Sequence, residues 1–271
     1  MARLFLKRTR LLAIALALPI AAHAQSNDAE LAQELTNPIA DLVTIPIQMN
    51  FDSGIGPADD GTQIRTNVQP VIPLELNEKW NLITRTIVPI IYQHDIFPGA
   101  GSQFGLGDIN ATLFFSPKKP TAGGMFWGVG PVFLLPTGSD DLLTADKWGA
   151  GPSAVVLALR GPWTIGVLAN HIWSFAGDDD RQDINNTFLQ PFVAYTWPSA
   201  WTVSVLSEST YNWEEKEWGV PVNFAVAKLV RIGKLPVSFL GGVGYWVQSP
   251  DNGPEGLRFR LQANIVLPKK K

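Results

Sequence analysis

The stretch 257–267 alternates between apolar and polar side chains, and this alternation constrains the fold more than any other feature of the chain. Its apolar positions are Leu257, Phe259, Leu261, Ala263, Ile265 and Leu267, and the residues between them are polar except for Val266. A period of two indicates a β-strand with one apolar and one polar face. Strands that cross a bilayer need about 9–11 residues, whereas strands of soluble proteins commonly have about five or six. We therefore expect a membrane-spanning strand.

The same alternation recurs from residue 42 onward, and the chain contains about twelve such strands. Long connections occur at 52–62, 93–103, 136–147, 175–186, 212–217 and 249–255, and they alternate with short ones at 76–79, 117–124, 160–162, 198–200 and 231–235. Outer-membrane barrels have long extracellular loops and short periplasmic turns. The sequence thus predicts an all-β fold, a transmembrane antiparallel up-and-down β-barrel in the cell outer membrane with both termini in the periplasm.

The two ends of the chain predict further segments. Residues 1–24 have a basic start, a short apolar run and a small-residue cleavage site, which are the features of a secretory signal peptide. Residues 25–41 favour a short helix that forms either a periplasmic or plug-like segment at the barrel mouth or a loose tail. The barrel is predicted over 42–268 and a basic tail over 269–271.

Composition supports a barrel and excludes several kinds of chemistry. The 10 Trp, 14 Phe and 4 Tyr suit aromatic girdles at the two membrane interfaces, although a soluble β-sandwich with a tryptophan-rich core is the alternative. The chain has no cysteine, so disulfides and thiolate metal sites are excluded. The net charge of −3 gives no sign of a nucleic-acid partner.

Charged residues on the polar strand faces are the candidates for lining a lumen. The inward candidates are Arg65, Arg85, Asp108, Glu208, Arg258 and Arg260. Rings of arginine in a pore favour anions, so we expect an anion preference if the barrel conducts. The alternative is that Arg258 and Arg260 pair with nearby acids and seal the lumen, because unpaired buried charges are costly.

Two other clusters are candidates for chemistry. Asp178, Asp179, Asp180 and Asp183 form a candidate cation loop, but without the glycine and terminal glutamate of an EF-hand a solvated acidic loop is the simpler interpretation. His171 lies near the predicted outer rim, yet Ser174 is too close along the strand to make a Ser–His pair, and no nucleophile-elbow spacing is present. We predict no enzymatic activity, no cofactor and no resident metal. The alternative is a lipid hydrolase.

Several segments resemble a known family. The stretches 30–42 (ELAQELTNPIADL) and 170–178 (NHIWSFAGD), together with Asn185-Asn186 and Gln190-Pro191-Phe192, resemble the bacterial MetA-pathway of phenol degradation family, regarded as outer-membrane transporters and sometimes mislabelled neuromedin U. The resemblance covers nearly the whole mature chain and implies a barrel that passes small molecules. Unlike most such barrels, the chain ends in Leu-Pro-Lys-Lys-Lys rather than an aromatic residue.

The functional prediction is a channel or transporter for small solutes, either aromatic or hydrophobic compounds or anions. The alternative is a closed structural or surface-interaction barrel. Outer-membrane lipid and lipopolysaccharide are the expected surroundings, and the solute and the oligomeric state stay open.

Overall fold

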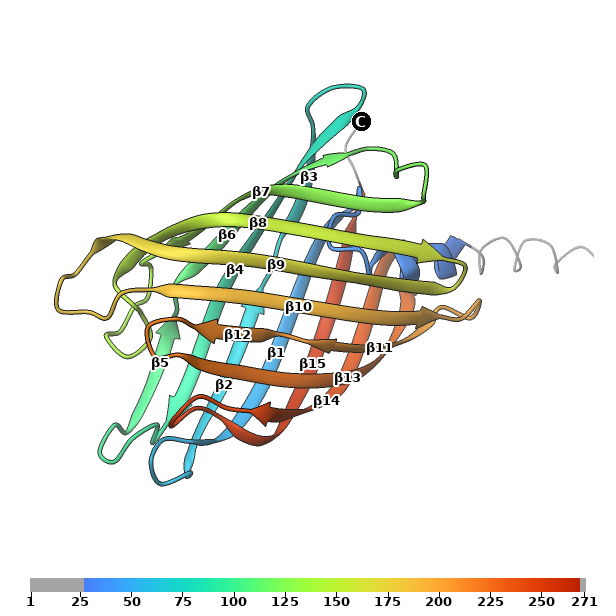
Figure 1. The fold of residues 1–271 in the computed structure, drawn as a ribbon. Helices are drawn as coiled ribbons and strands as arrows, with labels where there is room; N and C mark the ends of the chain where they lie inside the picture. Colours follow the sequence, from blue (N-terminus) through green and yellow to red (C-terminus); the bar gives the residue numbers. More distant parts are fainter. Residues whose placement is uncertain (1–26, 269–271) are drawn as a thin grey trace, which may run out of the picture.

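The computed structural model describes residues 27–268, and most of those after residue 42 lie in antiparallel strands (Figure 1). A helix over 27–34 precedes the strands, and no helix in the described range is long and apolar enough to cross a membrane. The predicted signal peptide and basic tail lie outside this range. The strands are β1 (Val43–Ile55), β2 (Gly61–Val68), β3 (Val71–Glu75), β4 (Trp80–His94), β5 (Ser102–Leu106), β6 (Ile109–Pro117), β7 (Met125–Leu135), β8 (Lys147–Arg160), β9 (Trp163–Gly177), β10 (Asn185–Thr196), β11 (Trp201–Ser207), β12 (Ser209–Asn212), β13 (Glu217–Ile232), β14 (Leu235–Gln248) and β15 (Glu255–Leu267).

The sheet closes on itself because the last strand pairs with the first. β15 and β1 run antiparallel in register from Val43↔Leu267 to Phe51↔Phe259. Three strands are each split into two segments that lie end to end beside the same neighbouring strand, namely β2 with β3, β5 with β6, and β11 with β12. The 15 segments therefore make a barrel of 12 strands. The structure therefore confirms the predicted closed, antiparallel, 12-stranded β-barrel.

Prolines explain why three of the strands are interrupted. Pro70 separates β2 from β3. Pro89 of β4 faces the gap between β5 and β6, where its carbonyl accepts a hydrogen bond of 2.9 Å from Gly107 N–H. In β13, the register Ser207↔Val222 places Pro221 opposite the gap between β11 and β12. Because proline has no N–H to donate, the backbone hydrogen bonding between the strands is interrupted at each point, although the strands stay side by side.

The wall carries its apolar side chains on the outside. In β15, Leu257, Phe259 and Leu261 are 52%, 52% and 57% exposed, whereas Arg258 and Arg260 are 9% and 4% exposed. This is the reverse of a soluble protein and is the arrangement that a lipid-facing barrel requires. The alternation in 257–267 therefore predicts correctly which face each of these side chains occupies.

The two ends of the barrel differ. At one end, here called the tight-turn end, the strands are joined by short turns, and the N-terminal segment (residues 27–42) lies there; at the other, the long-loop end, the connections are longer (Figure 1). The first long connection is shorter than predicted. Because β1 continues to Ile55 and β2 begins at Gly61, Asp52 and Thr62 belong to strands.

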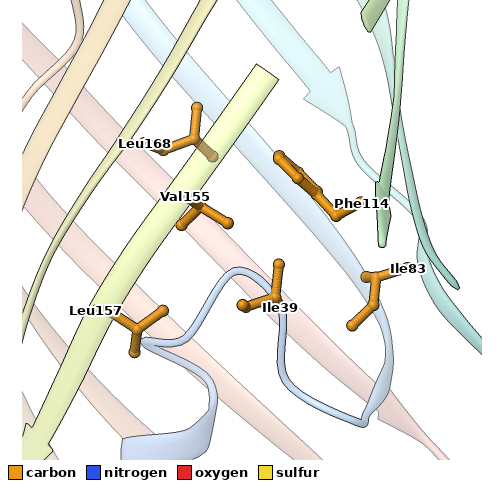
Figure 2. Close-up of a cluster of buried hydrophobic side chains, with 6 residues drawn as sticks. All are labelled: Ile39, Ile83, Phe114, Val155, Leu157 and Leu168. Carbon is orange, nitrogen blue, oxygen red and sulfur yellow. The ribbon is translucent and has the colours of Figure 1, made fainter. Parts of the chain in front are cut away.

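Ile39 of the N-terminal segment is the centre of an apolar cluster inside the barrel (Figure 2). Its side chain is 5% exposed. It packs against five buried residues of β4, β6, β8 and β9, namely Ile83, Phe114, Val155, Leu157 and Leu168. A second cluster joins Ala32 of the helix to Ala200, in the turn before β11, and to Leu229 of β13. These contacts pack residues 27–42 against the inner wall at the barrel mouth.

Candidate functional site: the barrel lumen

The lumen contains two cavities that meet at a polar layer. A cavity of about 220 Å³, the segment-side cavity, is bounded partly by the N-terminal segment. A cavity of about 630 Å³, the loop-side cavity, lies toward the long-loop end and is bounded by residues such as Ile55 and Pro254. Five residues border both cavities, namely Gln48, Gln69, Arg85, Gln190 and Glu208. This shared layer joins the two halves of a path along the barrel axis.

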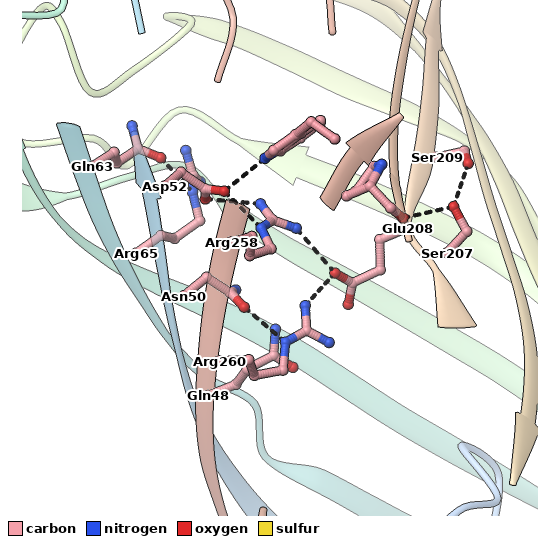
Figure 3. Close-up of polar contacts among 12 residues, drawn as sticks. Gln48, Asn50, Asp52, Gln63, Arg65, Ser207, Glu208, Ser209, Arg258 and Arg260 are labelled. Atoms are coloured by element: carbon pink, nitrogen blue, oxygen red, sulfur yellow. Dashed lines mark hydrogen bonds and ion pairs between the residues drawn. The ribbon is translucent and has the colours of Figure 1, made fainter. Parts of the chain in front are cut away.

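Four residues form an ion-pair bridge in the lumen: Asp52, Arg258, Glu208 and Arg260 (Figure 3). Arg258 donates to both carboxylate oxygens of Asp52, with Nε–Oδ1 and Nη2–Oδ2 distances of 2.7 and 2.9 Å. Glu208 accepts from Arg260, and its Oε2 lies 3.6 Å from Nη1 of Arg258. Since Glu208 comes from the gap between β11 and β12, the bridge links β1 and β15 to the strand that follows β14 and β13 around the wall.

The bridge is reinforced by neutral donors and acceptors. Arg260 Nε donates to Asn50 Oδ1 at 2.8 Å, and the indole N–H of Trp246 donates to Asp52 Oδ1 at 2.8 Å. The guanidinium of Arg258 also lies 4.6 Å from the centre of the Trp246 ring. Paired charges with this many partners can be held away from bulk water at an acceptable cost. The sequence predicts Arg258, Arg260 and Glu208 at the lumen, but it leaves out Asp52, the acid with the best geometry.

Arg65 and Arg85 line the loop-side cavity without an acidic partner. Arg65 Nε donates to Gln63 Oε1 at 3.3 Å, and Arg85 Nη2 donates to Gln69 Oε1 at 2.8 Å. Neither forms an ion pair with a carboxylate of residues 27–268. Among the lumen arginines of residues 27–268, the positive charge without an ion pair therefore lies on these two residues, whereas Arg258 and Arg260 are paired with carboxylates.

Asp108 has a different role from the predicted one. Its carboxylate does not border either cavity. Oδ1 accepts from Thr137 N–H, Gly138 N–H and the Thr144 hydroxyl at 3.1, 3.0 and 2.7 Å, and Oδ2 accepts from Ala145 N–H at 2.7 Å. Asp108 thus fixes the connection between β7 and β8 against the long-loop end of the barrel.

Polar contacts hold the N-terminal segment in the mouth. The Gln33 amide donates to Gly161 O at 2.7 Å, and the Thr36 hydroxyl donates to Thr164 Oγ1 at 2.7 Å. Arg231 donates through Nε and Nη2 to Asp28 Oδ1 at 2.8 and 2.6 Å. Partial burial of the Glu34 carboxyl, and then the nearby carboxylates of Glu30 and Asp41, raise the pKa of Glu34 above its usual value of 4.5. The seated segment therefore favours protonated Glu34.

The candidate cation loop does not gather its carboxylates. Asp183 pairs with Lys147 at 3.1 Å and accepts from Ser174 Oγ at 3.0 Å, and these hydrogen bonds lower the pKa of Asp183. Asp178 Oδ1 accepts from the backbone N–H of Asp180 at 2.9 Å. Within residues 27–268 no three His, Cys, Asp or Glu side chains are grouped to hold a metal ion. The loop is stabilised by internal contacts of its own.

His171 lies on the outer wall near the long-loop end and does not pair with Ser174. Its Nδ1 is 2.7 Å from the hydroxyl oxygen of Thr187, which also accepts from the indole N–H of Trp213 at 2.8 Å. The ring of Trp173 is 4.0 Å from the imidazole, centre to centre. The hydroxyl of Ser174 instead contacts Asp183. This histidine is part of an aromatic cluster at the rim.

Comparison with known proteins places the fold. No family model and no curated protein sequence matches the chain, so the resemblance to the MetA-pathway family stays a prediction. Among solved structures, the COG4313 outer membrane channel from Pseudomonas putida F1 is similar, with a TM-score of 0.65 and 16% identity over 83% of this chain and 96% of that chain. The NanC porin matches with a TM-score of 0.48 and 11% identity over 83% and 100% of the two chains. Outer membrane phospholipase A from Escherichia coli matches with a TM-score of 0.47 and 12% identity over 83% and 92%. At 16% identity, the likeness to the COG4313 channel establishes the fold, that of an outer-membrane β-barrel.

Proposed function

We propose that the protein is an outer-membrane channel for small solutes whose tight-turn end faces the periplasm and is restricted by the N-terminal segment. The observation that carries this proposal is the pair of cavities, about 220 and 630 Å³, which meet at a polar layer inside the closed barrel. Barrels of eight strands are filled by side chains and barrels of sixteen leave an aqueous channel, so 12 strands suit a narrow path.

Charge in the lumen gives this channel a preference for anions. Arg258 and Arg260 are neutralised by Asp52 and Glu208, so they set the width of the path more than its selectivity. Arg65 and Arg85 face the same path without an acidic partner. A fixed positive charge inside a narrow pore attracts anions and repels cations.

Single-channel recording in planar bilayers tests both parts of the proposal. The mature chain should give small currents, and deletion of residues 25–38 should enlarge them by removing the segment from the mouth. In a salt gradient, the reversal potential should indicate anion preference, and Arg65→Gln with Arg85→Gln should reduce it. Arg160→Gln is the matched control, because Arg160 lies at a tight turn and donates to Gly123 O at 2.7 Å outside the lumen.

A closed structural barrel is the second candidate, and the contacts of the N-terminal segment favour it. Ile39 fills the interior and Asp28 is paired with Arg231. In that case neither the mature chain nor the deletion variant conducts. Current that appears only after the deletion identifies the segment as a plug of a channel.

A further inference from the structure

The shared layer between the two cavities is formed from opposite sides of the barrel. Arg85 belongs to β4, and Glu208 lies between β11 and β12. Around the wall, β13, β14, β15, β1 and β2 separate these two positions in one direction, and β6, β7, β8, β9 and β10 separate them in the other. Both residues border both cavities. A cationic and an anionic side chain therefore reach the shared layer from facing strands.

Among the lumen arginines of residues 27–268, Arg85 alone borders both cavities. Arg65 and Arg258 border the loop-side cavity, and Arg260 borders the segment-side cavity. A solute that moves from one cavity to the other therefore passes Arg85. A fixed charge acts most strongly on an ion where the path is confined by walls of low dielectric constant. The charge met in the shared layer thus depends mainly on Arg85 and Glu208.

The carboxylate of Glu208 is bound to arginines on both sides of the shared layer. Its Oε2 accepts from Arg260, which borders the segment-side cavity, and lies 3.6 Å from Nη1 of Arg258, which borders the loop-side cavity (Figure 3). Within residues 27–268 no ion pair joins Glu208 to Arg85. Glu208 therefore offsets charge of the closing strand and leaves the charge of Arg85 in place.

Interruptions of the backbone pairing position both groups. Gln69 is buried beside Pro70, where β2 ends, and its Oε1 accepts from Arg85 Nη2 at 2.8 Å. Because this acceptor is neutral, it orients the guanidinium and preserves its charge. On the facing side, Glu208 lies in the gap opposite Pro221. The fold thus holds one uncancelled cation in the shared layer and keeps two others bound at its borders.

We propose that the shared layer is the selectivity filter of the channel, that Arg85 supplies its charge, and that Gln69 and Glu208 are positioning residues. Gln69 orients the guanidinium of Arg85. Glu208 holds Arg260 and offsets its charge. This inference rests on the proposed function and deepens it, because it separates the role of Arg85 from that of Arg65.

The charge of the shared layer can be measured without any current, because the chain has no cysteine and a single one can be introduced. Gln190→Cys places a thiol in the shared layer, on β10. The full mature chain in detergent is treated with anionic sulfonatoethyl methanethiosulfonate or with cationic trimethylammonioethyl methanethiosulfonate. Both reagents react with the same thiolate, so the ratio of the anionic to the cationic rate reports the electrostatic potential at that position.

Charge variants in the Gln190→Cys background locate the source of this potential. Arg85→Gln should lower the rate ratio by at least about tenfold, whereas Arg65→Gln should lower it by less than about threefold. Glu208→Gln leaves one positive charge of the closing strand uncancelled and should raise the ratio by at least about tenfold. Arg160→Gln, outside the lumen, should leave the ratio unchanged.

Glutamate in place of the two orienting glutamines tests the role of Gln69. Gln69→Glu puts a carboxylate against Arg85 and should lower the ratio about as much as Arg85→Gln does. Gln63→Glu makes the same change beside Arg65 in the loop-side cavity and should lower the ratio by less than about threefold. Equal effects of these two substitutions contradict the role assigned to Gln69.

Heat-modified migration on gels identifies folded barrels, and only these are compared. Equal effects of Arg85→Gln and Arg65→Gln contradict the proposal, as does a ratio that Glu208→Gln leaves unchanged or lowers. If Glu208→Gln does not fold, Arg85→Gln and Gln69→Glu decide. A thiol in Gln190→Cys that neither reagent modifies also overturns the proposal, because the shared layer is then closed to small ions. The expected ratios without current in planar bilayers refute the channel and leave the charge assignment in place, whereas current with ratios independent of Arg85 does the reverse.

Discussion

Replacing Ile39 by alanine should release the N-terminal segment from the barrel mouth. Ile39 is 5% exposed and packs against Ile83, Phe114, Leu157 and their neighbours inside the wall. Truncation of a buried isoleucine to alanine costs about 2–5 kcal/mol, since apolar contacts are lost and a void is left. The backbone hydrogen bonds between the barrel strands do not depend on Ile39. The lost packing energy therefore shifts the equilibrium between the seated and the released N-terminal segment. Even a loss of about 2 kcal/mol raises the fraction of molecules with a released N-terminal segment about thirtyfold.

Limited proteolysis of the purified protein measures this release. A glutamate-specific protease can cut at Glu30 and Glu34 when the segment leaves the mouth, and the cleavage rate follows the released fraction when opening is fast. We expect Ile39→Ala to speed cleavage by about thirtyfold or more. Ile39→Val, which costs about 0.5–1.5 kcal/mol, should have a much smaller effect. If Ile39→Ala is cut at the wild-type rate while the barrel stays folded, Ile39 does not hold the segment.

Three further outcomes are expected. A cysteine at Asp179 should be labelled on intact cells and one at Lys118 should not; the opposite pattern reverses the orientation of the barrel. Leu261→Arg places a charge on the lipid face and should cost about 2–4 kcal/mol of folding stability near the midplane. Gln262→Arg points inward and should cost much less. An equal loss of stability in refolding experiments on both variants would contradict the register. The N-terminal segment should be held less firmly in the mouth as pH rises from below 4.5, because the raised pKa of Glu34 means that ionisation of its carboxyl opposes the seated state. Protease cleavage of the wild type should then become faster at higher pH, and the dependence of the cleavage rate on pH should be flatter in Glu34→Gln. Identical pH dependences in the two proteins would exclude this role of Glu34.

The strand pattern of the fold was accessible from the sequence because it is a local property. Side chains on a strand alternate between faces, so the positions of Arg258 and Arg260 follow from their neighbours in 257–267. The proline gaps were not anticipated, because their effect depends on which residue of the adjacent strand stands opposite. Pro221 interrupts the ladder at Glu208 only through the register of β11 with β13.

Pairing in the lumen could not be predicted in the same way. Arg258 and Asp52 are separated by 206 positions and meet only because β15 closes onto β1. Asp52 lies at the start of the predicted loop 52–62, although its spacing of two from Asn50 indicates that the strand continues. For Asp108 the prediction was wrong in the other direction, because a residue expected to line the lumen does not border either cavity. Its alternation with Asn110 and Thr112 suggested the lumen, but the strand is interrupted there and the carboxylate turns to the connection after β7.

The four inward arginines therefore act differently although they are chemically identical. Arg258 and Arg260 are bound to carboxylates, so their charge is cancelled locally and they serve mainly to brace the lumen and limit its width. Removing Asp52 would leave a buried cation without its partner, a change that typically costs about 3–5 kcal/mol. Arg65 and Arg85 are oriented by neutral glutamines, which fix the guanidinium without cancelling its charge. If the proposed channel prefers anions, we expect that preference to depend on Arg65 and Arg85 more than on Arg258 and Arg260, because only the second pair is bound to carboxylates.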